Sequence, residues 1–396
     1  VPRRAPWNRS QTDSAGEDLA QVSSVRLFMA RAERVGVTVP LNPETRAAMI
    51  SICQALEGLP LGIELAATLL EHQSLAAVES TLLSSLASLT TSESDISPHH
   101  RSLRAVFEQS WHGLNAAEAR LLARCSVFRG GFTEAAAAAV AAAAPGQLTI
   151  LEHRSVLRRA DEGRYDMHEM MRQFAAAKLL AAGEAQSIAS KHSQYYLAQL
   201  MPTQHRQDIE LSDCQRALPA VALAMLVTEI DNIRQAWQQA VAERRFAELG
   251  QAADGLGHLL GKVGLLSEGQ ALFDRTCVEL SAAGAPASVL SGLNIQQAML
   301  CDRHVKYAET AAAAQRALAF ATTDLEQARA YLWCGTAQWK LDNLAAASTM
   351  LQQALQIFRR YQHTDGEANC LHELGSVAYR QGKLASAQER WEKALA

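Results

Sequence analysis

The stretch ELGSVAYRQGKLASAQERWEKALA, residues Glu373–Ala396, decides the fold of this chain. Small and apolar side chains recur at offsets of −1, +7, +12, +16, +19 and +20 from Gly375, which are Leu374, Gly382, Ala387, Trp391, Ala394 and Leu395. Small residues at +12 and +19 let two helices approach closely, and a larger residue at +16 fills the groove between them. The pattern therefore predicts a pair of helices of the kind that stacks into arrays.

The same spacing occurs three more times upstream. The units begin at Gly257, Ala298 and Gly335, so successive starts are 41, 37 and 40 residues apart (298−257, 335−298, 375−335). The offsets are those of the tetratricopeptide repeat (TPR), but the period exceeds the usual value of about 34 residues, which indicates longer helices or loops. We expect about four TPR-like repeats over residues 246–396. A stack normally ends in a polar capping helix, and because none follows here we expect the array to be truncated.

Three helices and a hairpin are predicted between residues 97 and 178. The helices are expected at about Ser102–Trp111, Ala116–Cys125 and Thr133–Ala143. Asn115 and Thr133 are the expected N-caps, because their side-chain oxygens can accept hydrogen bonds from free backbone N–H groups. The stretch VLRRADEGRYDM then reads as a two-stranded hairpin that turns at Asp161-Glu162-Gly163, and a helix resumes at His168. This order is the layout of a winged helix-turn-helix domain.

The N-terminal part, residues 1–96, is predicted to be helical with a tight corner. Asn42 is the expected N-cap of a helix that Gly58 ends, since glycine adopts the left-handed angles of a C-terminal cap at little cost. Pro60 cannot extend that helix, but it suits the first turn of the next one and holds Leu59 away from helical angles.

Further boundaries complete the predicted organisation. A Ser/Thr-rich linker is expected over Leu82–His100, with a domain boundary near Ser97. Residues 179–245 are predicted to be a helical connector to the repeats at 246–396. We therefore expect a mainly all-α chain with a helical domain, a winged helix-turn-helix that carries a small β-hairpin, and a TPR-like α-solenoid.

The composition excludes several classes of protein. With 37 basic and 41 acidic residues, the net charge of −4 does not indicate a general binder of polyanions. The seven cysteines are far apart and form no C-x-x-C pair, so reduced thiols are expected rather than a disulfide framework or a zinc site. No apolar run reaches the roughly 20 residues that a membrane span needs. We expect a cytoplasmic protein that does not contact membranes.

No motif for catalysis or metal binding is present. The phosphate-binding loop G-x-x-x-x-G-K-[ST] is missing, and the His-Glu pair at His372 lacks the second histidine of a zinc protease. The stretch GLGHLLG, Gly255–Gly261, is one residue too long for a dinucleotide fingerprint and is interpreted as helix packing within a repeat. We predict no catalytic residue, no metal site and no enzymatic activity in this chain.

Two features of the predicted winged helix admit more than one interpretation. Five basic residues lie close together, namely His153, Arg154, Arg158, Arg159 and Arg164. They could contact a DNA backbone or form an exposed basic face, and the acidic balance of the whole chain favours the second interpretation. His168 lies where a helix begins, a position at which free N–H groups favour an anion. From the residues alone, a capping or core histidine is the more ordinary role.

The order of these motifs resembles bacterial STAND-class regulators, which are signal-transducing P-loop ATPases of the nucleotide-binding adaptor type. Four motifs precede the repeats, in the order GLPLGIELAA, SVFRGGFT, RYDMHEMMRQFAAAKL and EIDNIRQAW. The resemblance implies that Pro60, in a corner with Gly58 and Leu59, lies against the adenine of a bound nucleotide. It also implies that His168 senses the phosphate of ADP as the histidine of an MHD motif, with Glu169 at a position where the family often has Asp.

In that family the ATPase core precedes the first helical domain, and this chain begins about where such a core would end. The resemblance thus implies a sensory and regulatory C-terminal part without a cofactor of its own, with ADP or ATP held by the full-length protein and its N-terminal ATPase core. The repeats would bind a protein partner or a small-molecule inducer and shift a two-state switch. Two alternatives stay open, a passive TPR scaffold for protein–protein interaction and a winged-helix DNA-binding protein. We expect no DNA binding by this chain.

Overall fold

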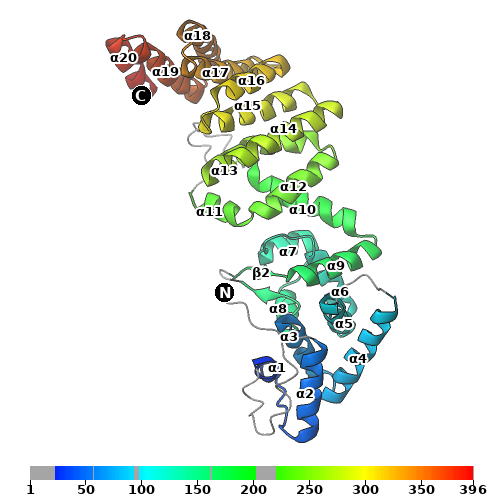
Figure 1. Ribbon diagram of the computed structural model, residues 1–396. Coiled ribbons are helices and arrows are strands. Elements are labelled where there is room, and N and C mark those ends of the chain that lie inside the picture. Colours follow the sequence, from blue (N-terminus) through cyan, green and yellow to red (C-terminus); the bar gives the residue numbers. More distant parts are fainter. Residues whose placement is uncertain (1–22, 57, 93–97, 161–162, 202–219, 396) are drawn as a thin grey trace. The chain divides into compact units, whose positions relative to one another are not determined.

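The computed structural model describes residues 23–56, 58–92, 98–160, 163–201 and 220–395, which are mainly helical (Figure 1). The chain forms two compact units, Val1–Ile188 and Ala189–Ala396. Sheet structure in the described residues is limited to two paired strands and one isolated bridge. The mainly all-α class is therefore confirmed, whereas the finer boundaries after residues 96, 178 and 245 stay predictions. None of the helices in the described ranges is long and apolar enough to cross a membrane.

The first unit opens with a group of helices that we call the N-terminal helices. They are α1 (Ser23–Arg34), α2 (Pro43–Ala55), α3 (Pro60–Thr68), the 3-10 helix η3 (Leu69–Glu71) and α4 (Leu75–Ser92). Asn42 caps α2 as predicted, because its side chain accepts from the Thr45 N–H at 2.8 Å and its own N–H donates to the Thr45 hydroxyl at 3.1 Å. This exchange satisfies two N–H groups that the helix leaves unpaired. Helix α1 packs against α3, and α2 packs against α4.

The linker predicted over Leu82–His100 is wrong for the residues that the structure describes. Helix α4 continues to Ser92, and the next helix begins at Pro98. Val78 and Leu82 lie one turn apart on α4 and are both fully buried. Packing of this apolar face outweighs the weak helix propensity of serine and threonine. The boundary near Ser97 lies outside the described residues.

Residues 98–181, which we call the hairpin segment, contain helices and a β-hairpin. The elements are α5 (Pro98–His112), α6 (Ala116–Cys125), α7 (Glu134–Ala141), α8 (Gln147–His153), β1 (Arg158–Arg159), β2 (Tyr165–Asp166) and α9 (Glu169–Ala181). The strands pair antiparallel, with Arg158 opposite Asp166 and Arg159 opposite Tyr165. The hairpin is confirmed, although Asp161 and Glu162 of its predicted turn lie outside the described residues.

Two helices of the hairpin segment begin at the predicted caps. The Asn115 side chain accepts from the N–H groups of Ala117 and Glu118, each at 3.0 Å, and the Glu118 carboxylate accepts from the Asn115 N–H at 3.1 Å. Thr133 accepts from the Ala136 N–H at 3.1 Å. These short polar side chains fix the residue at which each helix begins. Their oxygens accept hydrogen bonds from N–H groups of the first turn, which have no backbone acceptor within the helix.

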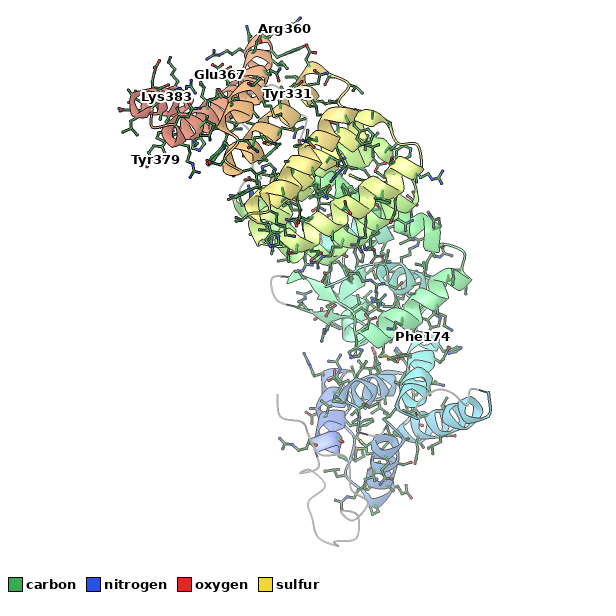
Figure 2. The ribbon with its side chains drawn as sticks, turned by 45° about the horizontal axis from the view of Figure 1, so that its top comes forward. Phe174, Tyr331, Arg360, Glu367, Tyr379 and Lys383 are labelled. Carbon is green, nitrogen blue, oxygen red and sulfur yellow. The ribbon has the colours of Figure 1, made fainter. Side chains whose placement is uncertain are left out.

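Aromatic side chains hold the helices of the hairpin segment together. Phe174 of α9 is labelled in Figure 2. Its ring centre lies 5.9 Å from that of Phe107 and 5.8 Å from that of Trp111, both on α5. The backbone of Phe132, before α7, forms an antiparallel bridge with Tyr165 of β2. These contacts fix the start of α9 and therefore the position of His168.

The second unit is a stack of helices, drawn from green to red in Figure 1. It contains α10 (Ala185–Leu200, whose first turn belongs to the first unit), α11 (Ala220–Thr228) and α12 (Ile230–Ala242), followed by the pairs α13 (Phe246–Val263) and α14 (Leu266–Ala282), α15 (Ala287–Arg303) and α16 (Tyr307–Phe320), α17 (Asp324–Lys340) and α18 (Leu344–Arg360), and α19 (Thr364–Arg380) and α20 (Leu384–Leu395). The four predicted repeats are thus present as four helix pairs. The first helices of the last three pairs have 17 residues each, which accounts for a period longer than about 34 residues.

The helices of a pair meet at the small residues that the spacing singled out. A Cβ on Gly335 of α17 would lie 2.6 Å from Cγ of Leu351 on α18. A Cβ on Gly375 of α19 would lie 2.4 Å from Nε1 of Trp391 on α20. Only glycine permits such an approach without a shift of the neighbouring side chain.

The residue at offset +7 adopts the same unusual backbone conformation in every repeat. Gly264, Val305, Asp342 and Gly382 have φ values of 80°, 62°, 68° and 76°. This left-handed conformation ends the first helix of a pair and turns the chain toward the second. It costs glycine little, but it strains a β-branched residue such as Val305.

Candidate functional site

The predicted corner at residues 58–60 has the expected backbone geometry. Gly58 is left-handed with φ +71°, and its N–H donates to the Cys53 carbonyl at 3.0 Å. Leu59 is extended, with φ −67° and ψ 118°, and Pro60 is the first residue of α3. Glycine therefore closes the end of α2 and proline starts α3, as the sequence predicted.

Pro60 is exposed, whereas the helix that follows it is buried. Gly62 and Ile63 of α3 are in the core, and so is most of the remainder of that helix. The corner therefore holds a rigid, apolar ring at the surface on a backbone that cannot move without disturbing the core. Because proline has no N–H, this edge can contact a flat apolar ligand without leaving a donor unpaired.

His168 lies at the predicted helix start and acts as its cap. It is exposed, and its Nδ1 accepts from the Met170 N–H at 3.3 Å. Next to it, Glu169 pairs with Arg172, with Nε 2.7 Å from Oε2. Across the described parts of the chain, no hydrogen bond or ion pair links His168 to the corner at residues 58–60. A nucleotide-sensing role for these residues stays a prediction.

The arginines of the predicted basic face are all engaged by acceptors of the protein itself. Arg158 donates to Asp166 at 2.9 Å, across the β-hairpin. Arg159 donates to the Tyr165 hydroxyl at 2.9 Å, and Arg164 lies 3.5 Å from a backbone carbonyl. Each of these three arginines therefore has a partner within the hairpin segment, and the choice between an exposed basic face and a DNA contact stays a prediction.

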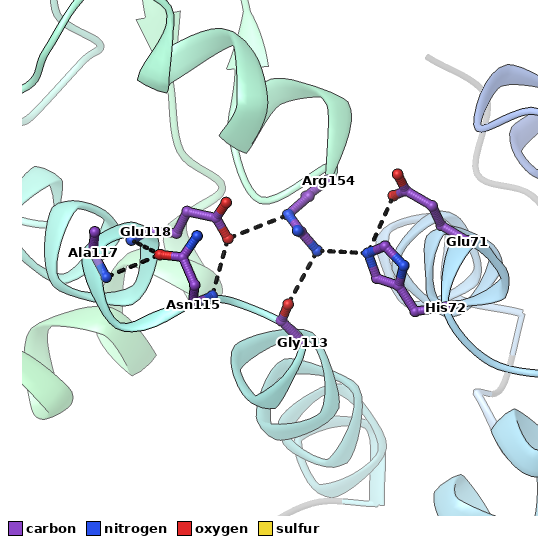
Figure 3. Close-up of polar contacts among 7 residues, drawn as sticks. All are labelled: Glu71, His72, Gly113, Asn115, Ala117, Glu118 and Arg154. Atoms are coloured by element: carbon purple, nitrogen blue, oxygen red, sulfur yellow. Dashed lines mark hydrogen bonds and ion pairs between the residues drawn. The ribbon is translucent and has the colours of Figure 1, made fainter.

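Arg154, at the end of α8, is the most connected of these arginines (Figure 3). Its Nη1 donates to the Gly113 carbonyl at 3.1 Å and to Nε2 of His72 at 3.2 Å. Its Nε lies 3.4 Å from Oε2 of Glu118, and the two side chains are only 23% and 11% exposed. Arg154 therefore joins the end of α5, the start of α6 and the residue after η3. Sequence reasoning missed this role, because the partners lie between 36 and 82 residues away.

In the second unit, charged side chains link the first helices of successive repeats. Arg329 of α17 donates to both carboxylate oxygens of Asp254 on α13, at 3.0 and 3.1 Å, and Gln296 of α15 donates to the same carboxylate. Lys340 of α17 pairs with Asp302 of α15 at 2.6 Å. We call the side of the stack that carries these links the first-helix face. It carries a partly buried polar network that is shared by several repeats.

The last two repeats add a partly buried acid to the first-helix face. Trp339 of α17 donates from Nε1 to Oε2 of Glu373 on α19 at 2.5 Å. Burial raises the pKa of the Glu373 carboxyl above its ordinary value, and the hydrogen bond from Trp339 and the charge of Lys340 offset part of that rise.

The glycine-rich stretch of α13 packs helices, but between repeats, whereas the sequence predicted packing within one repeat. A Cβ on Gly257 would lie 2.3 Å from Oε1 of Gln296, and one on Gly261 would lie 2.8 Å from Nη1 of Arg303. Both partners belong to α15, so the glycines let α13 and α15 approach closely. Within the ranges that the structure describes, no group of three His, Cys, Asp or Glu side chains could hold a metal ion.

Comparison with known families identifies the repeats. A family model described as tetratricopeptide repeat matches residues 326–396. The chain contains tetratricopeptide repeats. The match covers the last two helix pairs, and the helix pairs at α13–α16 have similar offsets and the same left-handed conformation at +7.

Curated relatives of the chain include regulators. "Putative HTH-type transcriptional regulator Rv0890c" of Mycobacterium tuberculosis and "Putative HTH-type transcriptional regulator Mb0914c" of Mycobacterium bovis are each 31% identical over 243 residues, 59% of this chain and 26% of theirs. "Uncharacterized protein Rv0894" of M. tuberculosis is 28% identical over 183 residues, 43% of this chain and 47% of its own. The chain thus spans about a quarter of the length of the regulators that it matches.

One solved structure is also similar. It is a Signal Transduction ATPase with Numerous Domains (STAND) protein with a tetratricopeptide repeat sensor from Pyrococcus horikoshii, with 14% identity over 94% of this chain and 59% of that chain. The TM-score of 0.36 is too low to establish a common arrangement. The chain thus resembles regulators and carries tetratricopeptide repeats, as the order of its motifs predicted.

Proposed function

We propose that this chain is the regulatory part of a STAND-type, nucleotide-dependent switch in transcription regulation. Its tetratricopeptide repeats would bind an inducer or a protein partner in the cytoplasm. The observation that carries the proposal is the stack of four repeats whose first helices share one polar face. Similarity to proteins named as transcriptional regulators supports it.

Binding on the first-helix face would act by differential affinity. Asp254, Gln296 and Arg329 connect three successive repeats, so a ligand that contacts one of them acts on the spacing of all three. A ligand that prefers one spacing shifts the equilibrium of the full-length protein toward the state in which that spacing occurs. The catalytic and phosphate-binding groups would belong to an ATPase core on a longer chain, so this chain would not be an enzyme.

The corner and His168 could each contact only one edge of a bound ADP or ATP. Pro60 presents an exposed apolar ring that suits the face of an adenine, and His168 presents an exposed imidazole at a helix N-terminus. Neither residue could hold a phosphate alone. In this proposal the nucleotide supplies a stable link between an ATPase core and the hairpin segment, while Pro60 and His168 position it.

Charge exchange in the full-length regulator tests the role of the repeats. The double variant Asp254→Arg/Arg329→Asp keeps an ion pair but inverts the charges on the first-helix face. The matched control Asp324→Arg/Arg360→Asp inverts another pair, which joins the start of α17 to the end of α18. We expect only the first variant to change the output at a reporter of the regulator's own promoter. Equal outputs from both variants would overturn this function for the face.

Release of labelled ADP from the full-length protein tests the nucleotide contact. We expect the His168→Ala variant to release ADP faster than the natural protein. His153 is exposed at the end of α8, so His153→Ala is the control and should release ADP at the natural rate.

A passive scaffold is the second candidate, and one observation favours it. The cap at His168 and the corner at Pro60 both have complete structural roles within the chain. If the scaffold is the correct function, His168→Ala and Pro60→Ala change stability alone and leave ADP release unaffected.

A further inference from the structure

We propose that Arg154 is a charge-sensitive latch that ties the end of α8 to the N-terminal helices, and that a positive charge at residue 72 releases it. This inference concerns the inside of the first unit and does not depend on the proposed function. It follows from how the three partners of Arg154 are distributed over the chain.

Two partners of Arg154 belong to its own segment and one does not. The Gly113 carbonyl and the Glu118 carboxylate lie in the hairpin segment, as Arg154 does, whereas His72 follows η3 of the N-terminal helices (Figure 3). Loss of the His72 contact therefore leaves the guanidinium held in place by Gly113 and Glu118. The link to the N-terminal helices is removed without unfolding the site around it.

The contact with His72 requires a neutral imidazole. A guanidinium has five N–H donors and no acceptor, so Nε2 of His72 must accept and its proton must be on Nδ1. A proton on Nε2 would abolish the acceptor and place two cations 3.2 Å apart. Glu71, with Oε2 3.8 Å from Nε2 of His72, is then the nearest anion for the imidazolium. A proton on Nε2 of His72 thus replaces its contact with Arg154, in the hairpin segment, by a contact with the adjacent Glu71.

Charged side chains surround this contact, so it is sensitive to the charge of residue 72. The groups that face it are Glu71 beside His72, Arg154 on α8 and Glu118 on α6. Residue 72 is the member of this group whose charge can be changed by substitution while Arg154 keeps its partners Gly113 and Glu118.

A second polar link crosses the same boundary beside Arg154. Arg31 of α1 donates to the hydroxyl of Ser155, which has φ +60°. Burial lowers the pKa of the Arg31 guanidinium, and the charge of Glu64 acts in the opposite direction. Helix α5 also packs against α3 and α4, so the hairpin segment stays attached there. Release of the latch therefore removes one of these two polar links between the end of α8 and the N-terminal helices, and the link from Arg31 to Ser155 remains.

Hydrogen exchange of the whole chain at pH 7.5, followed by mass spectrometry, tests the latch. His72→Lys places a permanent charge at the site, and His72→Gln keeps an acceptor without charge. We expect His72→Lys to raise the exchange of peptides covering residues 147–159 at least fivefold, and His72→Gln to match the natural chain. His372→Lys, at an exposed histidine of α19, is the control for adding a lysine and should leave these peptides unchanged.

A double variant of His72 and Arg154 provides the decisive measurement. In Arg154→Gln the cation that repels residue 72 is gone, so adding His72→Lys should produce no further increase in exchange. Unchanged exchange in His72→Lys, or an equal rise throughout the first unit, would overturn the latch.

Discussion

The two units of this chain join their helices in different ways. In the second unit, helices meet at glycines, as Gly335 meets Leu351 and Gly375 meets Trp391. In the first unit, long polar side chains also span the gap between segments, as Arg154 reaches His72 and Arg31 reaches Ser155. Glycine contacts leave no room for change, whereas polar contacts can be broken and made again. These glycine contacts therefore fix how closely the two helices of a pair approach, whereas the boundary inside the first unit is built to be adjustable.

Energies sharpen this difference. Adding a methyl group to a tightly packed contact costs about 1–3 kcal/mol. A partly exposed ion pair contributes about 0–1 kcal/mol, because water competes for both charges. We therefore expect substitutions at the glycine contacts to have larger effects than substitutions at polar contacts.

The largest expected effect is the protection of cysteines in both units. Burial raises the pKa of the Cys53 thiol in the first unit to about 12, and that of Cys370 in the second to about 12. Since the thiolate is the nucleophile, alkylation by iodoacetamide at pH 8 should be about a thousandfold slower than for a free thiol. Mass spectrometry of labelled peptides measures both rates, with urea-unfolded protein as the control. Faster labelling of Cys53 than of Cys370 would show that the first unit opens more often.

The next effect tests the glycine contacts directly. A Cβ on Gly255 of α13 would lie 2.1 Å from the backbone oxygen of Leu200, which cannot rotate away. We expect Gly255→Ala to lower the free energy of unfolding of the second unit by about 3 kcal/mol. Gly292 of α15 is the matched control, since nothing lies within 4 Å of an added Cβ. Gly292→Ala should raise stability by up to about 1 kcal/mol through helix propensity. Urea denaturation that finds equal effects would remove close packing as the cause.

A smaller effect is expected at a cap of the first unit. Asn115→Ala removes the acceptor for two N–H groups at the start of α6 and should cost about 1 kcal/mol of stability. Asn115→Ser keeps a capping oxygen and should recover most of that loss. Thermal unfolding monitored by circular dichroism compares the two variants. A loss as large as that of Gly255→Ala would contradict the contrast between the units.

The smallest effect concerns the pH dependence of the repeats. The pKa of Glu373 is raised by burial, so the folded chain holds this proton to a higher pH than the unfolded chain. Its contribution to stability is therefore greatest at low pH and falls as pH rises from the ordinary glutamate range through the raised value. Glu373→Gln keeps an acceptor for Trp339 and removes the titration. Urea midpoints at pH 5 and pH 7 should differ less in this variant than in the natural chain.

The sequence predicted local features well, because their causes are local. Asn42, Asn115 and Thr133 were expected as caps, and each accepts a hydrogen bond from the helix that it begins. The spacing around Gly335 and Gly375 predicted the helix pairs, because only small residues allow that approach. The hairpin and the corner at Pro60 followed from the same short-range rules.

The rest depended on contacts between distant residues. The serines and threonines after Leu82 suggested a linker, but burial of Val78 and Leu82 keeps α4 helical. The basic residues near Arg154 suggested one surface, but its partners come from separate helices and were not visible as a pattern. Roles for Pro60 and His168 with a nucleotide came from resemblance, and their local geometry neither requires nor opposes them.

The turn at offset +7 has a consequence for how this array can evolve. Four turns share one left-handed backbone shape, although glycine, valine and aspartate occupy the position. The shape is therefore imposed by the two helices that each turn joins, and the residue at the turn adapts to it. Val305 is 68% exposed, so its strain is not offset by burial. The residue at such a turn can therefore change at modest cost in stability, whereas the glycines between helices cannot. Sequence variation should accumulate at these turns and leave the distance between the paired helices unchanged.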